Sequence, residues 1–132
     1  MSEFADVGLI GLAVMGENLA LNMESRGFRV AVFNRTTSRV DDFIQGRARG
    51  KRFIGTHDLK EFVGSLQKPC KIVMLVKAGA AVDQLIDQLL PLLEPGDILI
   101  DGGNSLFTDT IRRTKRVEES GMLFVGSGVS GG

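Results

Sequence analysis

Short apolar runs alternate along the chain with longer segments in which apolar residues return every three or four positions. The runs lie at residues 6–10, 28–33, 53–54, 71–76, 98–100 and 123–125, and the third is the weakest. They predict strands, and the segments between them predict helices. Pro95-Gly96-Asp97 predicts a turn before the fifth run. The clearest helix has an apolar stripe that consists of Val82, Leu85, Ile86, Leu89 and Leu93.

Polar residues mark the start of two of these helices. Asp58, with Glu61 three residues later, predicts the cap of a short helix that runs through about Leu66. Ser105 predicts the cap of a helix that reaches about Ser120. The apolar faces of the first two helices are marked by Met15, Leu19, Met23, Val40, Phe43 and Ile44.

Strands that alternate with helices from end to end predict an α/β fold. We expect a Rossmann-like, doubly wound and mostly parallel sheet with helices on both faces and right-handed crossovers. The 132 residues fit a single domain. Ligands bind such sheets beyond the carboxyl ends of the strands, so the residues that follow each strand are the candidates for a site.

The first candidate follows the first strand and reads Gly11-Leu12-Ala13-Val14-Met15-Gly16. Gly11 permits a tight turn, Gly16 permits close packing of helix on strand, and the helix N-terminus offers N–H groups to an anion. Ala13 replaces the middle glycine of the general dinucleotide fingerprint, which holds a pyrophosphate slightly farther from the backbone. Glycines at strand ends also serve packing alone, so this loop needs support from a second position.

The second candidate is Asn34-Arg35-Thr36, about twenty residues after the glycine loop. An NAD site has an acidic residue here for the ribose 2′-hydroxyl, and this chain has none. Arg35 instead offers a planar fork of donors that suits a 2′-phosphate, which favours NADP. The alternative is a solvated loop arginine.

Three further loops follow later strands. Val76-Lys77-Ala78-Gly79 and Asp101-Gly102-Gly103-Asn104 contain small residues that leave room for a flat ring. Asn104 can read a carboxamide or a sugar hydroxyl, or it can be an ordinary turn residue. The segment at residues 126–132 has bare amides and hydroxyls that could hold a carboxylate or phosphate, or it is a linker.

Composition narrows the possible partners. Lysine plus arginine and aspartate plus glutamate each number 16, which argues against nucleic acid or a membrane surface. The basic stretch at residues 112–116 precedes Glu118 and Glu119, which predicts a solvated helix face that includes Arg113. His57 stands alone, so no metal site is predicted. The single cysteine, Cys70, and the lack of a signal segment favour a cytoplasmic location.

Taken together, these loops resemble the N-terminal part of the 6-phosphogluconate dehydrogenases, the decarboxylating enzymes of the pentose phosphate pathway. The similarity runs through the whole chain, and Ala13 belongs to the usual fingerprint of that family. Its most specific pieces are residues 8–16, Asn34-Arg35-Thr36, Val76-Lys77-Ala78-Gly79, Asp101-Gly102-Gly103-Asn104-Ser105 and Gly126-Ser127-Gly128-Val129-Ser130-Gly131-Gly132.

The resemblance implies specific roles. The residues expected to bind NADP are Gly11, Leu12, Ala13, Val14, Met15, Gly16, Asn34, Arg35, Thr36, Val76, Lys77, Ala78 and Asn104. Asn104 would also touch 6-phosphogluconate, together with Ser130, Gly131 and Gly132. The family's lysine base, glutamate acid, helical domain and homodimer interface are expected downstream of Gly132. The chain alone is therefore predicted to be inactive.

Two other functions stay open from the sequence. A non-catalytic dinucleotide sensor fits the short length, but it needs no anion loop such as Ser130-Gly131-Gly132. Another β-hydroxyacid dehydrogenase would share the fold and the first loop. The Asn34-Arg35-Thr36 and Val76-Lys77-Ala78-Gly79 pieces favour the sugar-acid enzyme over that alternative.

Overall fold

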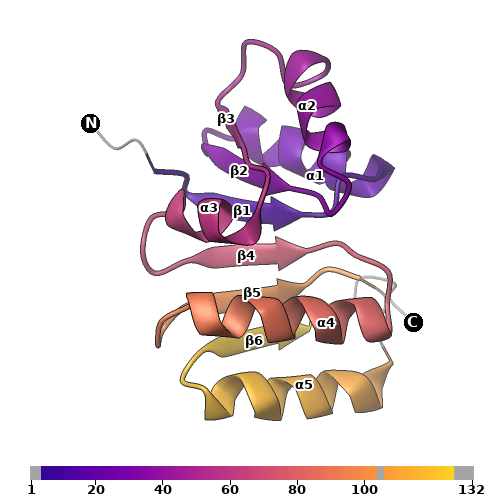
Figure 1. Cartoon of the computed structure of the whole chain (residues 1–132), viewed down its shortest axis with the longest axis vertical. Helices are drawn as coiled ribbons and strands as arrows, with labels where there is room; N and C mark the ends of the chain where they lie inside the picture. The colour runs from indigo at the N-terminus through magenta and orange to yellow at the C-terminus, as the bar shows by residue number, and fades with distance from the viewer. Residues whose placement is uncertain (1–3, 104–105, 127–132) are drawn as a thin grey trace.

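The computed structural model describes residues 4–103 and 106–126, and its strands form one sheet. Six parallel strands lie in the order β3-β2-β1-β4-β5-β6 (Figure 1). Their bounds are Val7–Ile10 (β1), Val30–Phe33 (β2), Phe53–Gly55 (β3), Lys71–Met74 (β4), Ile98–Asp101 (β5) and Leu123–Gly126 (β6). The predicted α/β fold is confirmed, since the order reverses direction between β1 and β4 as in a doubly wound sheet.

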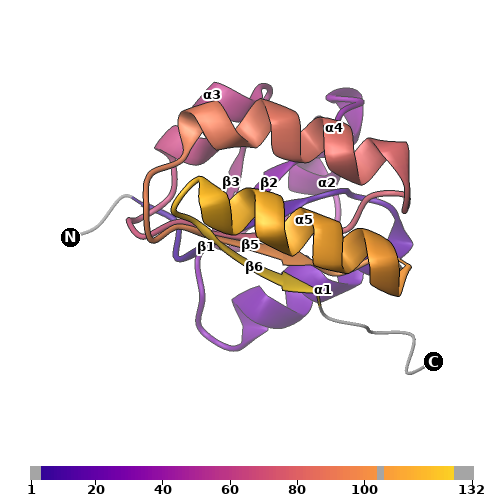
Figure 2. The same ribbon diagram turned by 90° about the horizontal axis from the view of Figure 1, so that it is seen from below.

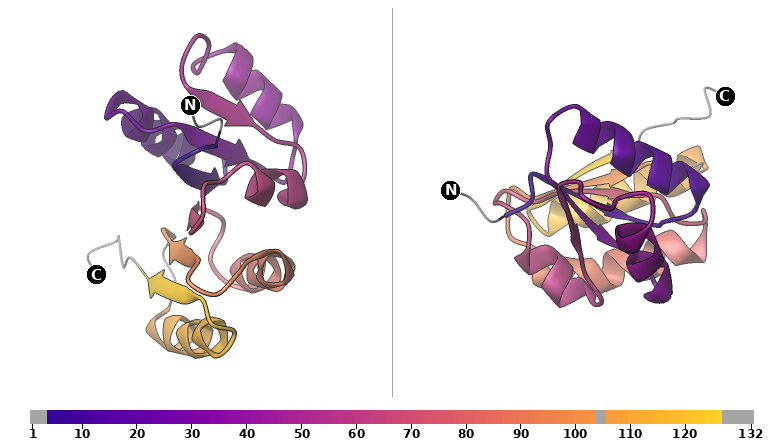
Figure 3. Two further views of the ribbon diagram at one scale, coloured as in Figure 1. Left: turned by 90° about the vertical axis from the view of Figure 1, so that its left-hand side faces the viewer. Right: turned by 90° about the horizontal axis from the view of Figure 1, so that it is seen from above.

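Helices cover both faces of the sheet. Figures 2 and 3 show α1 on one side and α3 and α4 on the other. The helices are α1 (Val14–Ser25), α2 (Ser38–Gln45), α3 (Leu59–Gly64), α4 (Ala80–Leu89) and α5 (Phe107–Glu119), with a 3₁₀ turn at Leu90–Leu92. Within the described residues, none of these helices has the length and apolar character needed to span a membrane.

The sheet separates two hydrophobic cores because successive strand residues point to opposite faces. On the α1 and α2 side, Leu9 and Val32 pack against Ala20, Val40 and Phe43. The larger core, on the side of α3, α4 and α5, includes Ile10, Phe62, Met74, Ile86, Leu99 and Val117. Strand β1 thus contributes Leu9 to one core and Ile10 to the other. The carboxyl end of β1 therefore lies between the two helical layers.

The helix caps agree with the sequence in one case and differ in another. Asp58 caps α3, and its Oδ1 accepts a hydrogen bond of 2.7 Å from the Glu61 N–H. The N-cap of α5 is Leu106, so the prediction that Ser105 occupies this position is wrong. The helix begins one residue later than the polar residue suggested, and no described side chain caps it.

Other element ends also differ from prediction: β2 begins at Val30 rather than at residue 28, and α3 ends at Gly64 rather than near Leu66. Strand β4 ends at Met74 rather than at residue 76. Helix α4 ends at Leu89, and the 3₁₀ turn that follows contains Pro91, which lacks the N–H needed to continue an α-helix. Leu93 still packs in the larger core, but from beyond the helix.

Candidate dinucleotide-binding site

The loops that follow β1, β2 and β4 converge where the strand order reverses. A pocket of about 430 Å³ lies there. Its lining comes from the ends of β1 and β2, from the loop after β4, and from one face of α4; these residues are Ile10, Gly11, Phe33, Asn34, Arg35, Val76, Ala81, Gln84, Leu85 and Gln88. The structure therefore brings together the first two candidate loops and Val76.

The loop after β1 has no room for side chains at its two glycines. Gly11 has φ +108°, and a Cβ there would lie 2.1 Å from the carbonyl oxygen of Leu75. A Cβ on Gly16 would lie 1.7 Å from the carbonyl oxygen of Gly11. Because neither residue has a side chain, the first turn of α1 packs closely on the end of β1. Ala13 is the N-cap of α1 and supplies no side-chain cap, so the helix presents amides suited to an anion.

The loop after β2 is fastened to the loop after β1 by Asn34. Its Oδ1 accepts a hydrogen bond of 2.8 Å from the Leu12 N–H, and its Nδ2 donates one of 3.0 Å to the Thr36 carbonyl. Arg35 and Thr36 are exposed, and Arg35 lines the pocket. A guanidinium at this position is available to an anion in the pocket.

Arg39 contacts the glycine loop, and the sequence did not single it out. It lies in the first turns of α2, and its Nη1 donates to the Leu12 carbonyl at 3.3 Å. Arg39 lies four positions after Arg35, a spacing that places two side chains on the same side of a helix. This spacing could have drawn attention to Arg39, but α2 begins at Ser38, so Arg35 lies outside the helix.

The loops after β4 and β5 pack directly on one another. A Cβ on Gly102 would lie 2.8 Å from Leu75 Cδ2, and one on Gly103 would lie 3.2 Å from the Val76 carbonyl oxygen. Asp101 Oδ1 accepts a hydrogen bond of 3.0 Å from the Gly103 N–H. Lys77 and Ala78 are exposed. The predicted contacts of Asn104, Ser130, Gly131 and Gly132 lie outside the described residues.

The prediction that Arg113 belongs to a solvated basic face of α5 is wrong, because its side chain is buried. Its side chain is 1 % exposed, whereas that of Arg112 is 54 % exposed. Arg113 lies four residues before the buried Val117, so both belong to the inward stripe of the helix. Hydrogen bonds from Arg113, which has the larger effect, and from Arg112 hold the pKa of the Asp83 carboxyl well below its usual range.

His57 lies apart from the glycine loop, after β3. Its Nε2 is 2.7 Å from Asp41 Oδ1, and this hydrogen bond raises the pKa of the imidazole. Within the part of the chain that the structure describes, no group of three or more histidine, cysteine, aspartate or glutamate side chains could hold a metal ion.

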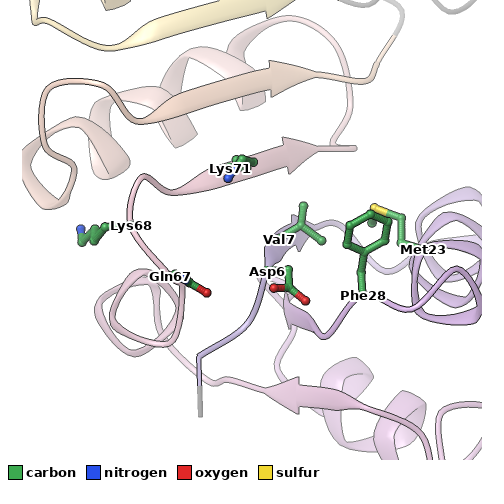
Figure 4. A pocket seen from close by; sticks show the side chains of 7 residues that line it. All are labelled: Asp6, Val7, Met23, Phe28, Gln67, Lys68 and Lys71. Atoms are coloured by element: carbon green, nitrogen blue, oxygen red, sulfur yellow. The ribbon is translucent and has the colours of Figure 1, made fainter. Parts of the chain in front are cut away.

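A second pocket, of about 450 Å³, lies at the opposite edge of the sheet (Figure 4). Its residues come from the starts of β1 and β4, from the end of α1 and the segment that follows it, and from the segment before β4; they are Asp6, Val7, Met23, Phe28, Gln67, Lys68 and Lys71. Figure 4 shows the Met23 side chain beside the Phe28 ring. Doubly wound sheets bind nucleotides at the carboxyl edge, so this pocket is not the dinucleotide site.

The parallel sheet, the glycine turn at its reversal point and the open N-terminus of α1 together define a dinucleotide-binding domain of the Rossmann type. A family model described as the NAD binding domain of 6-phosphogluconate dehydrogenase matches residues 6–132. The chain belongs to this family.

Individual relatives agree with that assignment. The chain is 65 % identical over 127 residues to the decarboxylating 6-phosphogluconate dehydrogenase of Dictyostelium discoideum, covering 96 % of this chain and 26 % of that protein. It is 59 % identical over 128 residues to the human enzyme of the same name, with 97 % and 26 % covered. The chain thus spans about a quarter of the length of the curated relatives it matches.

Solved structures show the same fold. The 6-phosphogluconate dehydrogenase of Plasmodium falciparum, solved in its apo form, with its cofactor NADP⁺ and with its substrate 6-phosphogluconate, superposes with a TM-score of 0.83 at 42 % identity. The match covers 90 % of this chain and 26 % of that one. The 3-hydroxyisobutyrate dehydrogenase of Mycobacterium tuberculosis gives a TM-score of 0.77 at 18 % identity, covering 93 % and 40 %, which shows a shared fold.

Proposed function

We propose that this chain is the NADP-binding part of a decarboxylating 6-phosphogluconate dehydrogenase. The observation that carries the choice of cofactor is Arg35, an exposed arginine that lines the pocket at the end of β2. An NAD site has a carboxylate near this position, and Asn34-Arg35-Thr36 supplies none. A 2′-phosphate on the adenosine ribose would accept hydrogen bonds from the Arg35 guanidinium.

The described residues suit each part of the dinucleotide. The adenosine would lie in the 430 Å³ pocket between the end of β2 and α4, against Phe33, Val76 and Leu85. The pyrophosphate would lie over the turn that joins Gly11 to Gly16, at the N-terminus of α1. The loop after β5, and the part of the loop after β4 that follows Val76, would flank the nicotinamide end. Bound NADP would supply a hydride acceptor.

The catalytic acid and base belong elsewhere in this proposal. Among the described residues that line the pocket, Arg35 is the one with an ionisable side chain, and arginine keeps its proton in proteins. The pocket that would hold the adenosine therefore binds its ligand without a described group suited to proton transfer. The lysine base and glutamate acid that the family uses would follow Gly132 in a longer protein.

The complete activity rests on the relatives' names and on the family resemblance. The substrate would be 6-phosphogluconate, oxidised at C3 and decarboxylated to ribulose 5-phosphate. Asn104, Ser130, Gly131 and Gly132 would contact that substrate. The cytoplasmic location favoured by a single cysteine, and the homodimer that the resemblance implies, belong to the same proposal.

Titration of the chain with reduced cofactors tests the first part of this function. The chain contains no tryptophan or tyrosine, so the fluorescence of the reduced nicotinamide is observed over little protein background. NADPH is expected to bind more tightly than NADH. Equal affinities would contradict the assignment of Arg35 to the 2′-phosphate.

A further inference from the structure

Arg113 connects two of the cofactor loops through one buried guanidinium. Its Nη2 donates a hydrogen bond of 3.0 Å to the carbonyl oxygen of Gly79, which ends the loop after β4 and is the N-cap of α4. Its Nη1 lies 3.8 Å from Oδ2 of Asp101, the last residue of β5. The guanidinium is therefore in contact with the ends of both loops.

Both contacts of Arg113 constrain the backbone of a loop, one directly and the other through Asp101. The Gly79 carbonyl is itself part of the loop, and it accepts from Arg113 directly. Asp101 acts through its other oxygen, which accepts from the Gly103 N–H at 3.0 Å and shapes the turn after β5. Since Gly103 packs against the Val76 carbonyl, a shift of either loop changes the gap between them.

The far side of the guanidinium is fixed by Asp83 on α4. Arg113 Nε lies 2.9 Å from Asp83 Oδ1, and Nη2 lies 3.3 Å from Oδ2. This two-point contact fixes the plane of the guanidinium as well as its position. An ammonium group is a compact point charge and cannot contact Asp83, Gly79 and Asp101 along three fixed directions.

We propose that Arg113 is a positioning residue for NADP, which sets the separation of the loops after β4 and β5 around the nicotinamide half of the cofactor. The inference rests on the proposed function, because it needs those loops to contact the dinucleotide. It assigns Arg113 no contact with the cofactor. A buried ion pair is weak evidence for added stability, so a role in loop geometry is the more specific account of this arrangement.

Measuring the affinity of two ligands distinguishes a positioning role of Arg113 from a general effect on folding. NADPH extends to the nicotinamide half, whereas adenosine 2′,5′-bisphosphate occupies the adenosine half near Arg35. A variant that only reduces the folded fraction weakens both ligands by the same factor. A variant that misplaces the two loops weakens NADPH more than the bisphosphate, which the two loops would contact through Val76.

The test compares Arg113→Lys with Arg112→Lys by calorimetric titration of each ligand, with circular dichroism melts as the folding check. Arg112 is the matched control because it is the neighbouring residue and binds the same Asp83 carboxylate at 3.1 Å, but from the exposed surface. Arg113→Lys is expected to weaken NADPH on the order of tenfold, as for one charged hydrogen bond, and the bisphosphate by less than about threefold. Arg112→Lys should change each affinity by less than about twofold.

Other results would overturn the inference. Unchanged NADPH affinity in Arg113→Lys, or an equal loss for both ligands, would show that Arg113 does not position the cofactor loops. If Arg113→Lys does not fold, Asp83→Asn is the variant to test. It weakens the two contacts that hold the Arg113 guanidinium in place. It should therefore also weaken NADPH more than the bisphosphate. A wild-type chain that binds neither ligand would instead contradict the proposed function.

Discussion

The side-chain oxygen of Asn34 accepts a hydrogen bond of 2.8 Å from the backbone N–H of Leu12. This bond joins the loop after β2 to the glycine loop after β1, across 22 residues of sequence. The nitrogen of the same amide donates to the Thr36 carbonyl. Asn34 therefore holds in one place the two loops that would surround the pyrophosphate and the 2′-phosphate.

Asn34→Ala is expected to lower the free energy of unfolding by about 1–3 kcal/mol, because the Leu12 N–H would lose its partner in a partly buried place. It should also weaken NADPH and NADH together, since the glycine loop serves both cofactors. Asn34→Asp is the matched variant: it keeps an oxygen for Leu12 but adds negative charge beside the 2′-phosphate. NADPH should then weaken much more than NADH. Denaturant melts and cofactor titrations measure both effects.

Arg35→Ala should weaken NADPH by about 1.5–3 kcal/mol, the range for charged hydrogen bonds, and leave NADH nearly unchanged. Arg49→Ala is the control, because Arg49 is an exposed arginine on the segment that enters β3 at the opposite edge of the sheet. A similar loss of NADPH affinity in both variants would indicate a general charge effect rather than a phosphate contact.

Gly16→Ala should destabilise the protein by at least about 1–3 kcal/mol, because the added Cβ overlaps the Gly11 carbonyl and the first turn of α1 must move. Cofactor affinity should fall with it. Gly64→Ala supplies the contrast: Gly64 is exposed near the end of α3, and its Cβ would meet no atom within 4 Å. That change should be neutral or stabilising by up to about 1 kcal/mol. In thermal melts, the Tm of Gly16→Ala should fall, whereas that of Gly64→Ala should stay the same or rise.

The His57 and Asp41 pair predicts a dependence of stability on pH. The pKa of His57 is raised in the folded protein by the hydrogen bond to Asp41. A raised folded pKa contributes stability fully below the unfolded pKa of about 6.5, and this contribution is lost as the pH rises through the folded pKa. The Tm difference between wild type and His57→Gln should therefore shrink from about pH 5 to about pH 9. Asp41→Asn should remove the same dependence.

Turnover provides a separate prediction. The chain should bind NADP but should not reduce it when 6-phosphogluconate is added, because the lysine base and glutamate acid that the resemblance implies would follow Gly132. A single positioned proton-transfer group supplies roughly 10²–10⁴ in rate. NADPH formation is measured for this chain and for a reading frame that continues past Gly132. Decarboxylation by the short chain that is lost in Lys77→Ala would assign the base to Lys77 instead.

Much of the fold followed from local pattern. Apolar runs and amphipathic segments placed all six described strands and the five α-helices near their observed positions, because burial on the two faces of a sheet imposes those periods. Ends were less predictable. The start of α5 at Phe107 and the 3₁₀ turn after α4 depend on how the chain packs beyond each helix, which a single polar residue or a stripe does not specify.

The sequence predicted glycines correctly where the backbone leaves no room for a side chain. Gly11 and Gly16 are confirmed as close-contact positions, since any side chain would collide with backbone. Arg113 was assigned to solvent because its helix is rich in charge, but its partners Asp83 and Gly79 lie about thirty residues away in sequence. Asp97, expected as a turn residue, is buried and accepts from the Cys70 N–H at 2.7 Å. Partners of this kind are set by tertiary packing.

The division of the interior into two cores has a consequence for local unfolding. Because α1 and α4 pack in separate cores, we expect the two helices to open independently, at different free energies. A dinucleotide bound where the layers meet would contact both helices, so opening either one would first require its release. Amide hydrogen exchange in α1 and α4 should therefore slow together as cofactor is added, and the two layers should come to behave as one cooperative unit.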